Sequence, residues 1–331
     1  MNQTTITGLA EAGFCTPTVS HNAAGEERRV GFELEFSGIS LEQTGAALSG
    51  ALGGQIEPQS AAELGVEVAD LGRFNVELDW AFLKRQAGGE QVEGWVKPLS
   101  EAAALLVPVE VVCPPLALSQ LPRLDAMVEA LRRAGAQGTE ESLIAAYGVH
   151  INAEIPRLDA ATLAAYLRAF ALLQWWLVDA HEVDLARKIS PYVDLYPEAY
   201  VRQLFSRAHP GLDDIFADYL QHNPSRNRAL DLLPLLAEID EKRVRERIDD
   251  AKIKPRPAFH YRLPNCQIER ADWSLSDSWN TWCVVEALAA RPDELAELGD
   301  RFLHAGRPLL GINRKDWLAF IDSWLRDHAL A

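Results

Sequence analysis

The sequence has few cysteines, and they show none of the spacings that mark a metal site or a disulfide framework. No CxxC motif joins any two of the four cysteines, which are Cys15, Cys113, Cys266 and Cys283. Zinc sites and disulfide frameworks usually show closely spaced pairs. We therefore expect four reduced thiols in a reducing compartment.

The sequence also lacks a recognisable targeting segment and a long apolar run. The N-terminal residues MNQTTITGLAEAGF contain no basic region followed by an apolar core, so we expect no signal peptide. The most apolar run, ALLQWWLV, is shorter than the length needed to cross a bilayer. These absences predict a cytoplasmic protein.

Positive charge is scarce as well. The chain of 331 residues has 32 Lys and Arg against 48 Asp and Glu, a net charge of −16. This balance argues against broad binding to a nucleic-acid backbone, although a local basic groove remains compatible with it. The glycine-rich segments lack the lysine and the spacing of a phosphate-binding loop. The excess of carboxylates either increases solubility or binds divalent cations.

Strand patterns dominate the first part of the sequence, and helical patterns dominate the later part. The segments with strand character are RVGFELEFS, VEVAD, RFNVELD, LLVPVEVVC, YGVHINAEI and, late in the chain, AFHYRL. This order predicts an α+β fold with one mainly antiparallel sheet. We expect a flexible N-terminal arm at 1–27, and one domain at 28–331 with a helical insertion at about 159–250.

One face of the first strand carries two neighbouring carboxylates, Glu33 and Glu35, between apolar residues that point to the other face. The same alternation puts Glu77, His150, Asn152 and Arg262 on polar strand faces, and Glu110 is the lone charge of an apolar strand. Such a face is often simply solvated. However, these faces carry no lysine, and Glu, His and Arg are suited to a divalent cation and phosphate. A shared cation would remove the repulsion between Glu33 and Glu35.

Several ordered motifs resemble those of the amidoligase family. They are GFELEF, NVELD, VEVVCPPL, YGVHIN, NPSRNRALDLLPL and LSDSWNTWCVVEALA, and the resemblance extends from about residue 27 to 329. That family is similar to glutamine synthetase and glutamate–cysteine ligase. The resemblance implies a curved, mainly antiparallel sheet with helices packed on one face. It also implies that the protein binds ATP and Mg²⁺, with Mn²⁺ as an alternative ion. The reaction that it implies forms an amide bond through an acyl phosphate.

The resemblance assigns roles to particular residues. The metal ligands it implies are Glu33, Glu35, Glu77, Glu110 and His150. The residues it places at the nucleotide are Glu33, Glu35, His150, Asn152 and Arg262, and those it places in catalysis are Arg262, His150, Arg226 and Arg228. Relatives often carry Glu two positions before the phosphate-binding arginine, whereas this chain has His260 two positions before Arg262. This departure puts one metal ligand in doubt.

Several alternatives remain open from the sequence. One is a metal-dependent hydrolase, although that class usually has more closely spaced histidine ligands than this chain shows. Arg226 and Arg228 either grip phosphate or a carboxylate, or pair with nearby acids such as Asp231 at a helix start. The chain could transfer phosphate without ligation, as a kinase does. It could also be a degenerate member that binds nucleotide or acts as a scaffold. We expect small-molecule or peptide carboxylate and amine substrates, and neither nucleic acid nor membrane as a partner.

Overall fold

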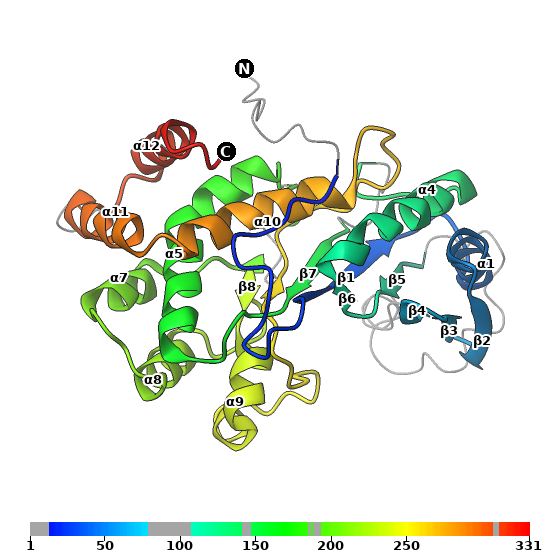
Figure 1. Cartoon of the computed structure of the whole chain (residues 1–331), viewed down its shortest axis with the longest axis horizontal. Coiled ribbons are helices and arrows are strands. Elements are labelled where there is room, and N and C mark those ends of the chain that lie inside the picture. Colours follow the sequence, from blue (N-terminus) through cyan, green and yellow to red (C-terminus); the bar gives the residue numbers. More distant parts are fainter. Residues whose placement is uncertain (1–12, 79–106, 141–146, 185–186, 188–192, 307–310) are drawn as a thin grey trace. The chain divides into compact units, whose positions relative to one another are not determined.

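The computed structural model describes residues 13–78, 107–140, 147–184, 187, 193–306 and 311–331 (Figure 1). Contacts between residues divide the chain into two compact units. The first unit contains the described parts of Met1–Arg28, Ala153–Leu263 and Ser276–Ala331. The second contains the described parts of Arg29–Asn152 and Pro264–Leu275. The predicted single domain with a helical insertion stays a prediction.

The second unit is built on an open sheet whose strands follow the order β2-β3-β4-β5-β1-β7, with β6 beside β1. The strands are β1 Arg29–Phe36, β2 Gln55–Ser60, β3 Glu63–Val68, β4 Gly72–Leu78, β5 Val109–Val112, β6 Leu116–Ala117 and β7 Val149–Ala153. The pairs β2–β3, β3–β4, β4–β5, β1–β5 and β1–β6 are antiparallel. The structure thus confirms a mixed α/β chain with a mainly antiparallel sheet.

Two helices pack beside this sheet. Helix α1 (Leu41–Leu52) begins at a capping box of Ser40 and Gln43 and ends at Gly53, whose φ of 75° favours glycine. Helix α4 (Leu124–Ala134) follows the short 3₁₀ helix η1 (Leu118–Arg123). Helix α1 contacts α4 and strands β2 to β4 (Figure 1). One face of the strands is fully buried, with Phe32, Leu34, Val76 and Val111 at 0% exposure, so burial of the alternating apolar residues drives this packing.

The first unit is mainly helical. Its helices are α5 Ala160–Ala180, α7 Glu198–Ser206, α8 Leu212–His222, α9 Leu233–Arg245, α10 Leu275–Ala289, α11 Pro292–Ala305 and α12 Arg314–Asp327. The short strands β8 (Leu230–Asp231) and β9 (His260–Tyr261) form an antiparallel pair. The unit thus combines a helical core with one short strand pair.

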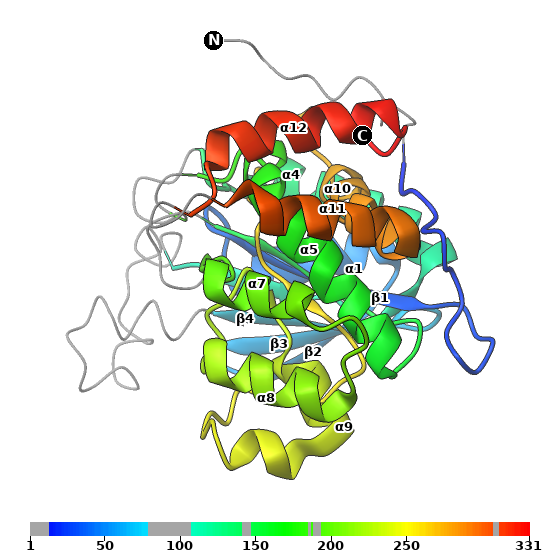
Figure 2. The same ribbon diagram turned by 90° about the vertical axis from the view of Figure 1, so that its left-hand side faces the viewer.

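Helix α5 is the core helix of this unit, and it contacts α7, α8, α11 and α12 (Figure 2). Among the described helices, it alone is long and apolar enough to cross a membrane by length and composition. However, 72% of its most apolar stretch is buried against the protein. Packing within the unit therefore accounts for its apolar character.

A buried ion pair joins the segment before β1 to helix α10 within the first unit. The side chains of Arg28 and Glu286 are each 1% exposed, and Arg28 Nη1 lies 2.7 Å from Glu286 Oε2. The Glu286 carboxylate also accepts hydrogen bonds from the Tyr166 hydroxyl (2.7 Å) and from Trp282 Nε1 (2.9 Å). Burial and the neighbouring Glu286 charge raise the pKa of Tyr166 well above its usual value, so its hydroxyl donates. The pair is therefore fully hydrogen-bonded.

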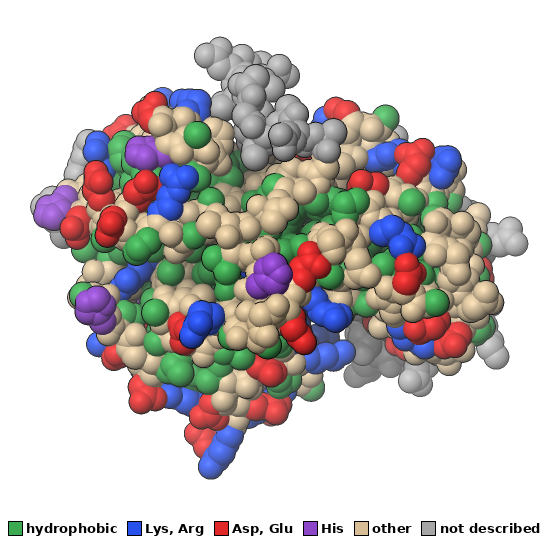
Figure 3. Space-filling model, in the orientation of Figure 1, with side chains coloured by type: hydrophobic (Ala, Val, Ile, Leu, Met, Phe, Trp, Pro, Cys, Tyr) green, Lys and Arg blue, Asp and Glu red, His purple; other side chains and the backbone are tan. Residues whose placement is uncertain are grey.

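Acidic and basic side chains lie interspersed over the surface seen in Figure 3. The net charge of −16 therefore does not form a single acidic patch in that view.

A disulfide bond joins Cys15 to Cys283 in helix α10, so the prediction of four reduced thiols was wrong for this pair. The two residues are 268 positions apart, and no short spacing signals their pairing. Hydrogen bonds from Cys15 N to Asn280 Oδ1 and from Trp279 Nε1 to Cys15 O hold the same segment against the helix. Cys113 and Cys266 are buried thiols outside any disulfide. The cysteines therefore no longer support a reducing compartment, and the cytoplasmic location stays a prediction.

Thiol titration checks this pairing. Two of the four cysteines should react when the protein is denatured without reductant, and four should react after reduction. The Cys15→Ser variant should give three reactive thiols without reductant, because Cys283 then loses its partner. Four reactive thiols in the unreduced wild-type protein would contradict the disulfide.

Candidate functional site

A row of glutamates crosses the sheet of the second unit. The cross-strand neighbours are Glu63 with Glu77, Glu77 with Glu110, and Glu110 with Glu35. Directly opposed residues share one face of a sheet, so four carboxylates on β3, β4, β5 and β1 face the same side. Like charges in direct opposition destabilise a sheet. A bound cation would offset this cost.

Glu35, Glu110 and His150 form a close group on this face. One potential ligand atom from each of the three residues lies within 4.8 Å of the others. His150 is 9% exposed, and its Nε2 lies 3.9 Å from Glu35 Oε1. Carboxylate oxygens suit hard divalent cations such as Mg²⁺ and Mn²⁺, and imidazole nitrogen suits transition metals. The group therefore has the residue types of a small cation site.

Glu33 contacts two other polar side chains, those of His150 and Asn152. Its Oε2 lies 3.0 Å from His150 Nδ1, and its Oε1 accepts a hydrogen bond of 2.8 Å from Asn152 Nδ2. An ionised carboxylate only accepts hydrogen bonds, so Nδ1 of His150 carries the proton in this contact, and Nε2 faces Glu35. A histidine that binds a metal is commonly oriented in this way by a carboxylate.

The backbone fixes Glu35 as well, because Gly148 N donates a hydrogen bond of 2.9 Å to its Oε2. The pattern of residues predicted that Glu33 and Glu35 share a face and would share a metal. The structure places Glu33 against His150 and Asn152, and Glu35 beside Glu110 and His150. The metal roles of these residues stay predictions.

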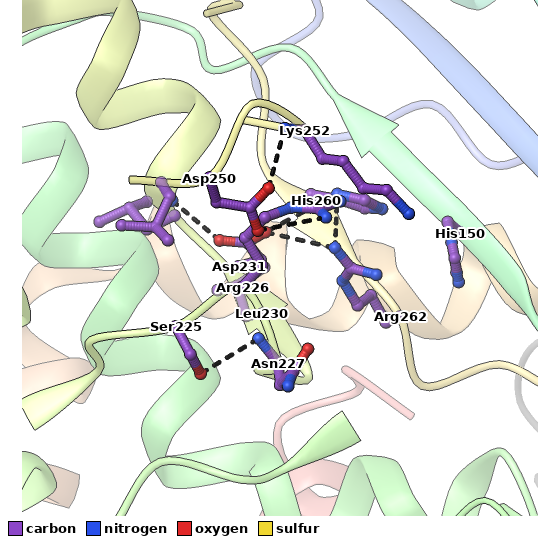
Figure 4. Close-up of polar contacts among 12 residues, drawn as sticks. His150, Ser225, Arg226, Asn227, Leu230, Asp231, Asp250, Lys252, His260 and Arg262 are labelled. Atoms are coloured by element: carbon purple, nitrogen blue, oxygen red, sulfur yellow. Dashed lines mark hydrogen bonds and ion pairs between the residues drawn. The ribbon is translucent and has the colours of Figure 1, made fainter. Parts of the chain in front are cut away.

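The first unit contains a cluster of arginines beside strands β8 and β9 (Figure 4). Arg262 Nη2 donates to Asp231 Oδ2 at 3.3 Å, and both side chains are buried. Arg226 Nη1 lies 3.6 Å from Asp250 Oδ2. Burial raises the pKa of the Asp231 carboxyl above its usual value, and the Arg262 guanidinium only partly opposes this shift. Burial and the Arg262 charge therefore act on the Asp231 carboxyl in opposite directions.

Arg228 lies near this cluster on the same loop as Arg226. Its Nη1 is 3.8 Å from Asp194 Oδ2, and its Nη2 donates to the carbonyl of His222 at 3.2 Å. The two loop arginines therefore pair with Asp250 and Asp194, whereas Asp231, the partner considered from the sequence, pairs with Arg262.

Three of these arginines keep a buried N–H group without a hydrogen-bond acceptor among the described residues. The groups are the Nε atoms of Arg226, Arg228 and Arg262. A buried donor that lacks an acceptor costs about 1–3 kcal/mol. Oxyanions such as phosphate are strong acceptors for guanidinium groups. The cluster therefore has both the charge and the open donors to hold an anion.

Sequence patterns missed several members of both clusters. Glu63 follows the same alternation as the other glutamates, but its place in the row depends on strand register, which the alternation does not give. Arg256 and Asp250 lie between helix α9 and strand β9, in a segment where periodicity carries no signal. Only their contacts in the folded chain identify them.

The fold and these clusters define the class of the chain as a mixed α/β protein with a polar, acid-rich sheet face in one unit and a buried arginine cluster in the other. The family model described as "putative amidoligase enzyme" matches residues 26–284. The chain therefore belongs to the amidoligase family, as its motifs predicted, and the family description supports a ligase. No curated protein and no solved structure matches the chain.

Proposed function

We propose that the protein is an ATP- and Mg²⁺-dependent carboxylate–amine ligase with a glutamine-synthetase-like catalytic sheet. The observation that carries this proposal is the group of Glu35, Glu110 and His150, whose ligand atoms lie within 4.8 Å of one another on one sheet face. Membership of the amidoligase family supports the ligase class. The arginine cluster supports an anionic substrate or cofactor, because its buried Nε donors need acceptors.

The residues of the sheet face fit a divalent cation that binds together with phosphate. Mg²⁺ usually takes one or two protein carboxylates and completes its shell with water and phosphate oxygens. Glu35 and Glu110 supply two carboxylates, and His150 supplies a nitrogen that makes Mn²⁺ an alternative. When bound, such an ion offsets negative charge on the phosphate oxygens during transfer. Glu33 keeps His150 in the orientation that directs Nε2 toward Glu35.

The proposed reaction has two steps. A substrate carboxylate oxygen attacks the γ-phosphorus of ATP, and the bond from that phosphorus to ADP breaks. The neutral amine nitrogen then attacks the acyl carbon, inorganic phosphate leaves, and the nitrogen loses a proton as the amide forms. Guanidinium groups such as those of Arg226 and Arg262 would donate hydrogen bonds to the phosphate oxygens and stabilise their charge. No covalent bond to the protein is required.

Calorimetric titration of ATP tests the proposal. We expect binding with Mg²⁺ or Mn²⁺ and much weaker binding with a chelator. Glu35→Gln should weaken metal-dependent binding at least about tenfold, because it removes a charged ligand. Glu67→Gln is the matched control, since Glu67 is an exposed residue on β3 outside the glutamate row. It should bind ATP like the wild type.

Product analysis then separates the related activities. Carboxylate–amine pairs that release ADP should also yield an amide. A stable phosphorylated product without consumption of the amine would indicate a phosphotransferase. Absence of nucleotide binding under all of these conditions would contradict the ligase proposal.

A further inference from the structure

His260 lies between two arginines of the first unit and is 4% exposed. Its Nδ1 is 3.2 Å from Arg256 Nη2 and 3.3 Å from Arg262 Nη2. A guanidinium can only donate hydrogen bonds, so Nδ1 must accept both of them and carries no proton. The imidazole is then neutral, with its proton on Nε2.

Arg262 uses this contact together with a second one. One terminal nitrogen of its guanidinium, Nη2, donates to both His260 Nδ1 and Asp231 Oδ2, each at 3.3 Å. That nitrogen carries two protons, so one is directed to each acceptor. The buried Nε of Arg262 keeps its proton without an acceptor among the described residues. The two contacts therefore fix the plane of the guanidinium and leave a donor available.

We propose that His260 is a positioning residue that holds Arg256 and Arg262 side by side without neutralising them, so that they bind a phosphate oxyanion. This proposal deepens the proposed function and rests on it for the identity of the phosphate group. The charge of the side chain at position 260 decides how much positive charge the two guanidiniums keep. A carboxylate between the two guanidiniums would hold them equally well but would cancel part of their charge. An apolar side chain would leave two like charges without a common acceptor.

The composition of the cluster agrees with this role. The cluster contains three arginines, Arg226, Arg256 and Arg262. The acids that pair with them are two, Asp231 and Asp250. A charged acceptor at position 260 would balance the three guanidiniums with three carboxylates. The neutral histidine keeps an excess of positive charge for an anion.

Binding of pyrophosphate in the presence of a chelator tests the role of His260 in the absence of a bound metal ion. Calorimetry should compare the wild type with His260→Gln, which keeps a neutral acceptor, with His260→Glu, which adds a charge, and with His260→Leu, which has no acceptor. We expect His260→Gln to stay within about threefold of the wild-type affinity. The Glu and Leu variants should each lose about tenfold or more, which corresponds to about 1.4 kcal/mol.

The outcomes separate the two parts of the proposal. Wild-type affinity in His260→Glu would overturn the charge argument, and wild-type affinity in His260→Leu would overturn the positioning role. Failure of the wild type to bind pyrophosphate would overturn the oxyanion subsite. That result would not contradict the proposed function. The separate titration of ATP with and without Mg²⁺ tests the proposed function.

Nitrogen-15 NMR of the histidine ring provides a measurement that does not depend on the folding of charged variants. The shifts of the two ring nitrogens distinguish protonated from unprotonated atoms, and the His260→Gln variant assigns the signal. We expect the unliganded wild type near neutral pH to carry the proton on Nε2 alone. A proton on Nδ1, alone or together with Nε2, would overturn the proposed acceptor role.

Discussion

Replacing Glu286 with glutamine is expected to lower the free energy of unfolding by about 3–5 kcal/mol. The reason is that Arg28 is 1% exposed and would be left as a buried charge without its counter-ion. The Tyr166 hydroxyl and Trp282 Nε1 would lose an anionic acceptor at the same time. Urea denaturation followed by tryptophan fluorescence measures this loss, provided that both proteins unfold with the same denaturant slope.

Two further variants make this result interpretable. Glu294→Gln disrupts the pair of Arg291 and Glu294, whose side chains are 36% and 34% exposed, and should cost less than about 1 kcal/mol. The double variant Arg28→Met with Glu286→Leu removes both charges and should recover much of the loss. A Glu286→Gln protein as stable as the Glu294→Gln protein would contradict the role of the buried pair.

Replacing Glu110 with glutamine is expected to have opposite effects with and without a divalent cation. Glu110 lies directly opposite both Glu35 and Glu77, so the loss of its charge relieves repulsion in the metal-free protein. This relief should raise the free energy of unfolding by about 0.5–1 kcal/mol. The same change removes a proposed ligand from the group with Glu35 and His150. Stabilisation by Mg²⁺ should therefore largely disappear.

Thermal and urea unfolding with and without Mg²⁺ measure both effects. At a metal concentration 100 times its dissociation constant, the wild type should gain about 2.7 kcal/mol, and Glu110→Gln should gain much less. Substrate-dependent ADP release should fall about 100-fold in the variant. Glu63→Gln is the matched control, because Glu63 ends the same row outside the close group. It should keep the response to Mg²⁺, and an equal response in Glu110→Gln would contradict the proposed ligand.

Strand alternation predicted the first strand correctly, but none of the predicted strand segments covers β2. Arg29–Phe36 is a strand with Glu33 and Glu35 on one face, and the Ser40 capping box starts helix α1. These features depend on residues that are close in the sequence, so their physical cause is visible there. The ordered motifs also identified the amidoligase family, which the family model confirms over residues 26–284.

The same patterns did not predict which residues far apart in the sequence pair with one another. The disulfide of Cys15 and Cys283 spans 268 positions and contradicts the prediction of reduced thiols. The four-membered row of glutamates depends on the register of three strand pairs, and register is set by packing of the apolar face and by the turns. Two acids on one strand were predictable, but the neighbours of each acid were not.

The sequence by itself determined the strand faces, the acidic balance of the chain and its family. Only the tertiary structure decided that Glu33 contacts His150 and Asn152, and that Glu35 lies with Glu110. It also decided that His260 accepts hydrogen bonds from Arg256 and Arg262. The physical reason is that periodicity fixes the side to which a residue points, whereas strand register and loop packing fix the atoms that it meets.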